Sequence, residues 1–295
     1  MYDTIVVPTD GSEHAVRAAE HALKLADAFD ATVHLLNVVD VQEAAGFFNA
    51  GGVDQEYVGR LEDAGRELIR ETQNQFEGSD AVQTAVVKGG PARGILDYAD
   101  DHDADLLVMG THGRKGVNRF VAGSVTEKVL RLAEIPVMTT RAVEASEIAD
   151  GYDRILVPTD GSDCAAEAID HAIDIAQAFD ATVYTLYVVD MGVLTAEPDI
   201  APATETMDQL EKLGEDATSA VAERMRDAGV EVETAVRRGF PAQTLLEHAD
   251  ENDVDLIAMG THGRSGFERF FLGSTTEKIV RRAEMPVLAV PHEQQ

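Results

Sequence analysis

The sequence predicts an α/β fold that is built twice, as two repeated domains that each contain an open parallel sheet with helices on both faces. Short apolar runs alternate with longer segments in which apolar residues recur at helical spacing. Residues 110–131 return as residues 260–281 without insertion or deletion. We therefore expect a first domain over residues 1–140, an acidic, alanine-rich linker over residues 141–151, and a second domain over residues 152–295.

The first elements of each half follow from short local signals. A strand over residues 4–7 is stopped by Pro8, and Ser12 is the expected N-cap of the helix that comes next. That helix carries an apolar stripe at helical spacing, formed by Val16, Ala19, Leu23 and Ala26, which indicates core packing. A second strand is expected over residues 32–39.

The two halves differ most after the second strand, where residues 41–54 and residues 191–204 read as irregular. Helices are expected over residues 55–76 and 206–228, and strands over residues 82–88 and 232–237. Pro91 and Pro241 suit the first turn of a further helix. The closing strands are expected over residues 135–139 and 285–289, where a proline near the start fits an edge position.

Composition limits the kinds of partner. The net charge is −30, with 24 Lys and Arg against 54 Asp and Glu, while 44% of the residues are hydrophobic. This combination indicates a folded core under a solvated acidic surface, similar to proteins of a salt-rich cytoplasm, and it argues against nucleic acid as a partner. A single cysteine, Cys164, and the lack of a long apolar run favour a cytoplasmic protein that does not insert into membranes. A position near a helix start is expected to lower the pKa of Cys164.

One motif organises each half: Gly110-Thr-His-Gly113, nine residues, then Gly123-Ser124. An apolar strand precedes it, and Ser124 is expected to open the helix that follows. Glycines allow backbone amides to approach an anion closely. A helix N-terminus offers unpaired N–H groups and the positive end of the helix dipole, so phosphate is the natural ligand. The alternative is an ordinary turn followed by a capping box between Ser124 and Glu127.

Three segments should meet at the carboxyl edge of the sheet, because parallel strands place their ends together. The first strand delivers residues 8–10, the second delivers residues 38–40, and the fourth delivers the glycine motif. Together they would offer an apolar slot for a base, a carboxylate for a ribose hydroxyl or a metal ion, and amides for phosphates.

With these residues the chain resembles the ATP-binding branch of the universal stress protein family, whose signature is Gly-x2-Gly-x9-Gly-(Ser/Thr). The resemblance covers nearly all of both halves and includes Val-Pro-Thr-Asp-Gly-Ser after the first strand. It implies five parallel strands in the order 3-2-1-4-5, an adenine nucleotide alpha hydrolase-like fold, and pairing of domains through their last strands. The resemblance further suggests a homodimer of the whole chain.

The resemblance also implies which residues would bind ATP, with magnesium as the expected metal and its ligands unknown. In the first half these are Pro8, Thr9, Asp10, Val38, Gly110, Thr111, His112, Gly113, Arg114, Gly116, Gly123, Ser124, Val125 and Thr126. In the second half they are Pro158, Thr159, Asp160, Val188, Gly260, Thr261, His262, Gly263, Arg264, Gly266, Gly273, Ser274, Thr275 and Thr276.

The expected function is a tandem universal stress protein that binds ATP in each half and regulates a stress response through its nucleotide state. No residue is assigned as catalytic, because nothing marks a nucleophile or an activating partner for His112. The alternatives are a weak ATP hydrolase or nucleotide-transferring enzyme, against which the lack of a Walker motif counts, and a structural protein with vestigial sites. Lys115 and Asn118 become Ser265 and Glu268, so we expect tighter ATP binding in the first half.

Overall fold

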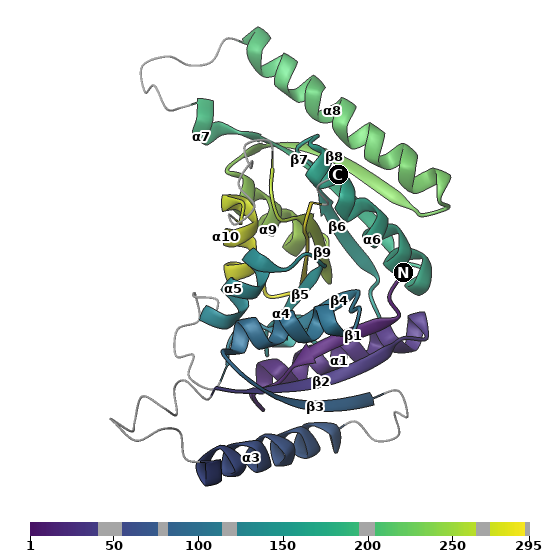
Figure 1. Ribbon diagram of the computed structural model, residues 1–295. Helices are drawn as coiled ribbons and strands as arrows, with labels where there is room; N and C mark the ends of the chain where they lie inside the picture. The colour runs from purple at the N-terminus through teal and green to yellow at the C-terminus, as the bar shows by residue number, and fades with distance from the viewer. Residues whose placement is uncertain (41–54, 76–81, 114–122, 195–203, 264–271, 293–295) are drawn as a thin grey trace. The chain divides into compact units, whose positions relative to one another are not determined.

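The structure is a computed structural model that describes residues 1–40, 55–75, 82–113, 123–194, 204–263 and 272–292 (Figure 1). It divides into two compact units, Met1–Ala149 and Asp150–Gln295. Each unit is an α/β domain with the alternation of strands and helices that the sequence predicts.

The first unit contains five strands. Its elements are β1 (Thr4–Pro8), α1 (Glu13–Phe29), β2 (Thr32–Val39), α3 (Gln55–Gln73), β3 (Val82–Lys88), α4 (Pro91–Asp101), β4 (Leu106–Gly110), α5 (Ser124–Leu132), β5 (Val137–Thr140) and the 3-10 turn η1 (Glu144–Ser146). The second unit repeats this series. Its elements are β6 (Arg154–Pro158), α6 (Asp163–Phe179), β7 (Thr182–Asp190), α7 (Met191–Leu194), α8 (Thr204–Asp227), β8 (Val232–Gly239), α9 (Pro241–Glu251), β9 (Leu256–Gly260), α10 (Ser274–Arg282) and β10 (Val287–Val290).

The sheet of each unit has the strand order that the family resemblance implies. In the first unit the order is β3-β2-β1-β4-β5, and all four neighbouring pairs are parallel. In the second unit the order is β8-β7-β6-β9-β10, again with parallel pairs. The helices cover both faces: α6 packs beside α8, and α9 packs beside α10 (Figure 1). The strand order reverses between β1 and β4, and between β6 and β9, which places a ligand crevice at the carboxyl ends of these strands.

The duplicated sequence segments correspond to duplicated contacts. Tyr2 is fully buried and packs edge-on against Phe29, with ring centroids 5.1 Å apart. Tyr152 and Phe179 repeat this arrangement at 5.4 Å. Edge-to-face aromatic pairs add about 0.5–1.5 kcal/mol beyond the area that they bury. The pair joins the start of β1 to the end of α1 and thereby fixes the helix against the sheet.

The expected N-cap of the first helix is confirmed, because the side chain of Ser12 accepts from the backbone N–H of Ala15. The second half repeats this cap with Ser162 and Ala165. One expectation was wrong: residues 191–194 form a helical turn, α7, instead of irregular chain. Asp190 explains it, because its carboxylate oxygen Oδ1 accepts from the N–H of Gly192 at 2.8 Å and caps the turn.

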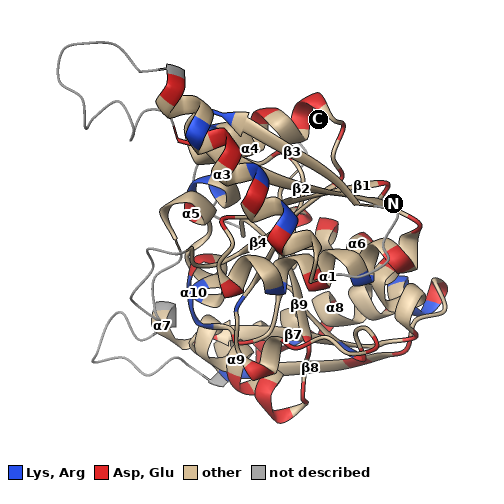
Figure 2. Cartoon of the chain, turned by 90° about the horizontal axis from the view of Figure 1, so that it is seen from below, with Lys and Arg blue, Asp and Glu red and all other residues tan. Residues whose placement is uncertain are grey.

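The charges of the chain lie mainly on helices and connecting turns, where acidic residues outnumber basic ones in both units (Figure 2). Many arginines pair with a carboxylate one helical turn away, as Arg93 does with Asp97 at 2.8 Å. Such exposed pairs contribute little to stability, because water and salt screen them. No helix among the described residues is long and apolar enough to cross a bilayer.

Candidate functional site

The site begins where β1 ends and is held to the neighbouring strand. Pro8 ends the strand, and the N–H of Thr9 then donates to the carbonyl oxygen of Leu36 on β2 at 2.8 Å. The side chain of Asn37 donates to the carbonyl oxygen of Thr9, also at 2.8 Å. In the second half Thr159 donates to Leu186 at 3.0 Å, but Tyr187 stands where the first half has Asn37. Two of the three expected segments therefore meet.

The turn from β1 into α1 holds Asp10 in a defined orientation. The N–H of Gly11 donates to Thr9 Oγ1, and the N–H of Ser12 donates to Asp10 Oδ1, both at 3.1 Å. Gly11 has a φ of 73°, a conformation that strongly favours glycine. Asp160 is held in the same way by the N–H of Ser162 at 3.0 Å. One carboxylate oxygen is thus fixed by the turn in each half.

The other carboxylate oxygen of Asp10 faces the glycine motif. A Cβ atom placed on Gly113 would overlap Asp10 Oδ2, and one placed on Gly263 would lie 2.8 Å from Asp160 Oδ2. In addition, the hydroxyl of Ser12 donates to the carbonyl oxygen of His112 at 3.4 Å. The turn after the first strand and the glycine motif, about 100 residues apart in sequence, therefore form one site in each half.

The two ends of the motif are joined by a pair of hydrogen bonds that we call the motif neck. In the first half the N–H of Gly123 donates to the carbonyl oxygen of Thr111 at 2.6 Å, and Thr126 Oγ1 donates to the carbonyl oxygen of Gly110 at 2.9 Å. The second half forms the same neck between Gly273 and Thr261 at 2.7 Å and between Thr276 and Gly260 at 2.9 Å. The hydroxyls of Thr126 and Thr276 therefore hold the helix to the strand.

The described glycines of the motif are required for space. None of Gly110, Gly113 and Gly123 has a positive φ. A Cβ atom on Gly110 would lie 2.7 Å from the backbone of His14 in α1, and one on Gly123 would lie 3.2 Å from the carbonyl oxygen of Thr111. These glycines are therefore explained by space and not by a positive φ, because Gly110 and Gly123 lie against backbone atoms and Gly113 lies against the carboxylate of Asp10.

The helix N-terminus at the neck has no side-chain cap. Gly123 and Gly273 are the N-caps of α5 and α10, and neither can supply a capping side chain. Ser124 is the first helical residue, so the capping box with Ser124 as the cap is not formed. Glu127 instead pairs with Arg131 at 2.6 Å. The first amides of α5 and α10, on Ser124, Val125, Ser274 and Thr275, therefore lie at an end that is suited to an anion.

The histidine of the first motif is buried and has an assignable tautomer. His112 is only 8% exposed, and its Nδ1 lies 3.1 Å from Thr111 Oγ1. Because Thr111 Oγ1 donates to the carbonyl oxygen of Thr140 at 3.2 Å, it accepts from His112, so Nδ1 carries the proton. In the second half His262 Nδ1 lies 2.8 Å from Thr261 Oγ1.

Sequence reasoning missed His14, which lies beside this histidine in the first turn of α1. The rings of His14 and His112 have centroids 5.2 Å apart. Burial lowers the pKa of His14, and the neighbouring His112 and Arg141 side chains lower it further. Its counterpart Cys164 is buried, and burial raises the pKa of its thiol, so the expected lowering was wrong. The one signal in the sequence that could have found them is their position, since His14 and Cys164 each lie four residues after the site aspartate, Asp10 or Asp160.

Some expected site residues lie elsewhere or outside the described residues. The side chain of Val38 packs towards α4, since a Cβ atom on Gly94 would lie 2.8 Å from Val38 Cγ1; Val188 occupies the equivalent position of β7. Arg114, Gly116, Arg264 and Gly266 lie outside the described residues, as do Lys115, Asn118, Ser265 and Glu268. Within the described ranges no group of three or more His, Cys, Asp or Glu side chains is arranged to hold a metal ion.

Comparison with known proteins gives one consistent answer. The model of the universal stress protein family matches residues 1–141 and 151–291. Universal stress protein MJ0531 of Methanocaldococcus jannaschii is 40% identical over 139 residues, which are 47% of this chain and 82% of that protein. A universal stress protein of Mycolicibacterium smegmatis is 29% identical over 287 residues, 95% of this chain and 92% of that protein. The crystal structure of a universal stress protein from Archaeoglobus fulgidus has the same fold, with a TM-score of 0.72, 21% identity, and coverage of 99% and 97%.

Proposed function

Because this chain belongs to the universal stress protein family and carries two of its domains in tandem, we propose that each half binds one adenine nucleotide at its glycine motif. ATP is the expected ligand. The protein acts in the stress response through the presence or absence of bound nucleotide, without a dedicated catalytic turnover of ATP.

The observation that carries the proposal is the motif neck beside an uncapped helix N-terminus. In both halves the neck holds the first amides of α5 or α10 next to the glycines that follow β4 or β9. Backbone amides at a helix N-terminus are a common phosphate-binding arrangement, since their dipoles favour negative charge. The described parts of both motifs carry this geometry, which favours two working sites over vestigial ones.

Each segment of the site has a role in this proposal. The backbone at the ends of β2 and β7, at Val38 and Val188, is proposed to lie nearest to the base, since the side chain of Val38 packs towards α4. Asp10 and Asp160 accept from ribose hydroxyls or contribute to a magnesium site. The amides of residues 124–126 and 274–276 hold the phosphates beside Gly123 and Gly273, and Arg114 and Arg264 are proposed to neutralise them. Magnesium typically takes one or two carboxylates together with substrate phosphates, so a single aspartate in each half suits it.

The proposal concerns binding, with slow ATP hydrolysis as its alternative. The Nδ1 proton of His112 is engaged by Thr111, and the residue is buried. General-base catalysis needs a proton acceptor within reach of the attacking group. In the second half Ser162 Oγ donates to Asp160 Oδ1 at 2.5 Å, but this hydroxyl also accepts from the N–H of Ala165 as the N-cap of α6. An assay of phosphate release at saturating ATP separates binding from hydrolysis. Several turnovers per second would show that the protein is an enzyme.

Two further elements of the proposal rest on other grounds. The family resemblance supports pairing of the halves within the chain through β5 and β10, and the acidic composition supports action in a salt-rich cytoplasm. Cysteines introduced at Thr139 and Ala289 would test the pairing by formation of a cross-link under mild oxidation, with Cys164→Ser as the background.

The experiment that tests the proposed function is equilibrium dialysis of the full chain against ATP, AMP and GTP, each with magnesium. Preference for the two adenine nucleotides, with two sites per chain, would support it. Equal retention of GTP would point to a phosphate site without recognition of the base, and no retention of any nucleotide would overturn the proposal.

A further inference from the structure

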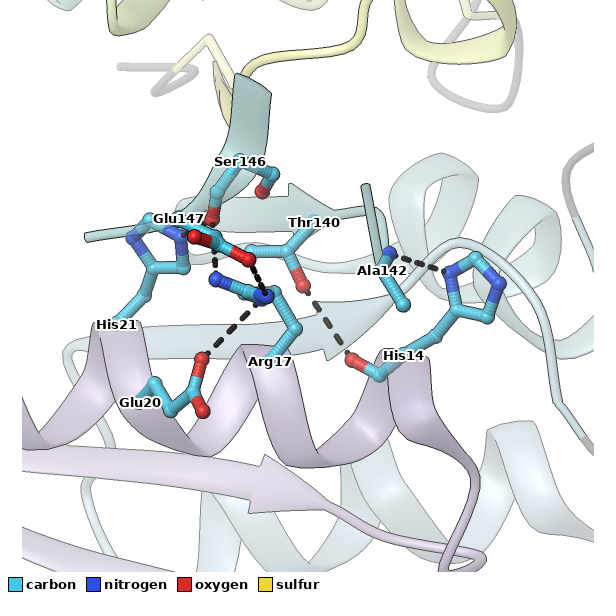
Figure 3. Close-up of polar contacts among 8 residues, drawn as sticks. All are labelled: His14, Arg17, Glu20, His21, Thr140, Ala142, Ser146 and Glu147. Carbon is cyan, nitrogen blue, oxygen red and sulfur yellow. Dashed lines mark hydrogen bonds and ion pairs between the residues drawn. The ribbon is translucent and has the colours of Figure 1, made fainter. Parts of the chain in front are cut away.

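The chain segment that follows β5 is fastened to α1 by side chains of that helix (Figure 3). We call residues 141–147 the strap. Ser146 of the strap is only 1% exposed. Its carbonyl oxygen accepts from His21 Nε2 at 2.9 Å and from Arg17 at 3.2 Å, and a second nitrogen of Arg17 lies 3.3 Å from the carboxylate of Glu147. These contacts hold the far end of the strap against the middle of α1.

The near end of the strap is held by His14. The backbone N–H of Ala142 donates to His14 Nδ1 at 3.0 Å, while Thr140 Oγ1 makes a longer contact of 3.4 Å with the carbonyl oxygen of His14 (Figure 3). Because Nδ1 accepts a hydrogen bond, the neutral ring carries its proton on Nε2. Burial favours this neutral form by lowering the pKa of His14.

The same side chain touches the glycine motif. The His14 ring lies 5.2 Å from that of His112, and its backbone fills the space beside Gly110, where a Cβ atom would lie 2.7 Å away. His14 therefore contacts both the motif that is proposed to hold phosphates and the first peptide of the strap. Its contacts form a short, continuous path from one to the other.

The second half lacks this connection among its described residues. Cys164 stands at the position of His14, and its thiol contacts the backbone of His262, but it has no ring and no nitrogen to hold the chain after β10. Glu167 stands at the position of Arg17 and pairs with His292, the counterpart of Ala142, at 2.7 Å. The chain after β10 is thus attached to α6 through a different residue, one helical turn farther from the motif.

We propose that His14 is a positioning residue that couples nucleotide occupancy of the first motif to the strap, the chain segment that leads into the second half. The inference rests on the proposed function. Phosphates at the first amides of α5 restrict the motif neck, and the neck restricts Thr111 and His112. His112 restricts the ring of His14, and that ring holds the N–H of Ala142. Nucleotide in the first half therefore slows opening of the strap, and nucleotide in the second half leaves it unchanged.

Hydrogen–deuterium exchange on the full chain, with and without saturating ATP and magnesium, measures this coupling. Coupled sites typically influence each other by about 5- to 150-fold, so we expect exchange of the amides of residues 142–147 to slow by at least about fivefold with nucleotide. His14→Asn keeps an acceptor near the position of Nδ1 but removes the ring contact with His112. His14→Phe keeps a ring but removes the acceptor. Both variants should lose the nucleotide effect, and His14→Asn alone should keep the slow exchange of Ala142 without nucleotide.

Controls separate this inference from the proposed function. Cys164→Ser in the second half should leave exchange of the strap and its response to nucleotide unchanged. Dialysis on the same samples reports binding: if ATP does not bind, the proposed function fails. If ATP binds to both halves and exchange of residues 142–147 does not change, or if His14→Asn and His14→Phe respond like the wild type, the coupling through His14 is overturned.

Coupling is reciprocal, which gives a second measurement that does not depend on variants of His14. Arg17→Ala removes two contacts with the far end of the strap while leaving the motif intact. It should weaken ATP binding in the first half, by the full factor by which ATP slows strap opening in the wild type if the variant's strap is mostly open. Unchanged affinity in a variant whose strap amides exchange as fast as unprotected amides would contradict the proposal.

Discussion

The carboxylate of Asp10 occupies the space that a side chain at Gly113 would need. Residues far apart in sequence thereby form one surface at the end of the sheet, and Asp160 and Gly263 repeat the arrangement. The aspartate is held by the turn through one oxygen, and its other oxygen faces the motif. A ligand at the motif therefore meets a carboxylate whose position is set before binding.

Asp10→Asn should weaken ATP binding in the first half by about 10- to 100-fold, because hydrogen bonds to charged groups contribute about 1.5–3 kcal/mol. The amide oxygen can still accept from the N–H of Ser12, so the midpoint of thermal unfolding should change little. Titration of the variant in an Asp160→Asn background isolates the first site. Unchanged affinity would show that Asp10 does not contribute to nucleotide binding.

The first half should bind ATP more tightly than the second at low salt. Lys115 and Asn118 are replaced by Ser265 and Glu268, which makes the second motif more negative by two charges. Variants that each retain one working site allow the two dissociation constants to be compared. The difference should shrink as salt screens the charges, and equal constants at low salt would refute the expectation.

The stability of the first half should depend on pH through His21. Burial lowers the pKa of its imidazole from 6.5 to about 4, so the folded protein keeps it neutral while the unfolded chain protonates it. The stabilisation is fully present above pH 6.5 and is lost as the pH falls towards 4. The loss amounts to about 3 kcal/mol. His21→Gln retains a donor for the carbonyl oxygen of Ser146 and should flatten this dependence in chemical denaturation, whereas His171→Gln on α6 serves as the matched control. An unaltered pH profile in His21→Gln would show that another group titrates.

Salt should stabilise the whole chain, since a net charge of −30 opposes the compact state by self-repulsion. Raising potassium chloride from about 0.1 M to about 2 M reduces the screening length from about 10 Å to below 3 Å. Thermal unfolding followed by circular dichroism should show a higher midpoint at each step. A midpoint that falls with salt would mean that favourable ion pairs outweigh the repulsion.

The fold could be predicted from the sequence because its signals are local and occur twice. Ser12 caps α1 as its place before the apolar stripe indicates, and the strands lie within a few residues of their expected bounds. The strand order came from the family resemblance, since alternation alone does not fix the order of neighbours. Comparison of the two halves then indicated which segments form the candidate site.

The remaining parts of the site depend on contacts that local sequence does not encode. His14 and His112 are 98 positions apart, and only the close packing of α1 on β4 at Gly110 brings their rings together. The acidic, alanine-rich composition of residues 141–151 is typical of a linker and gives no sign that Ser146 is buried. The sequence did not indicate Gly123 as the N-cap of α5, because the neighbouring Ser124 is of a residue type that caps helices more often.

The most direct measurement is calorimetric titration of ATP and magnesium into the full chain and into Gly123→Val and Gly273→Val. A side chain at either glycine would press on a backbone carbonyl, 3.2 Å away at Thr111 or 3.0 Å away at Thr261, and open the motif neck. Gly90→Val is the matched control, because Gly90 is also an N-cap glycine but has no atom within 4 Å of an added Cβ. We predict two sites in the wild type and in Gly90→Val, and one site in each neck variant. Two sites retained in both neck variants, or no binding to the wild type by titration and dialysis, would contradict nucleotide binding at the motifs.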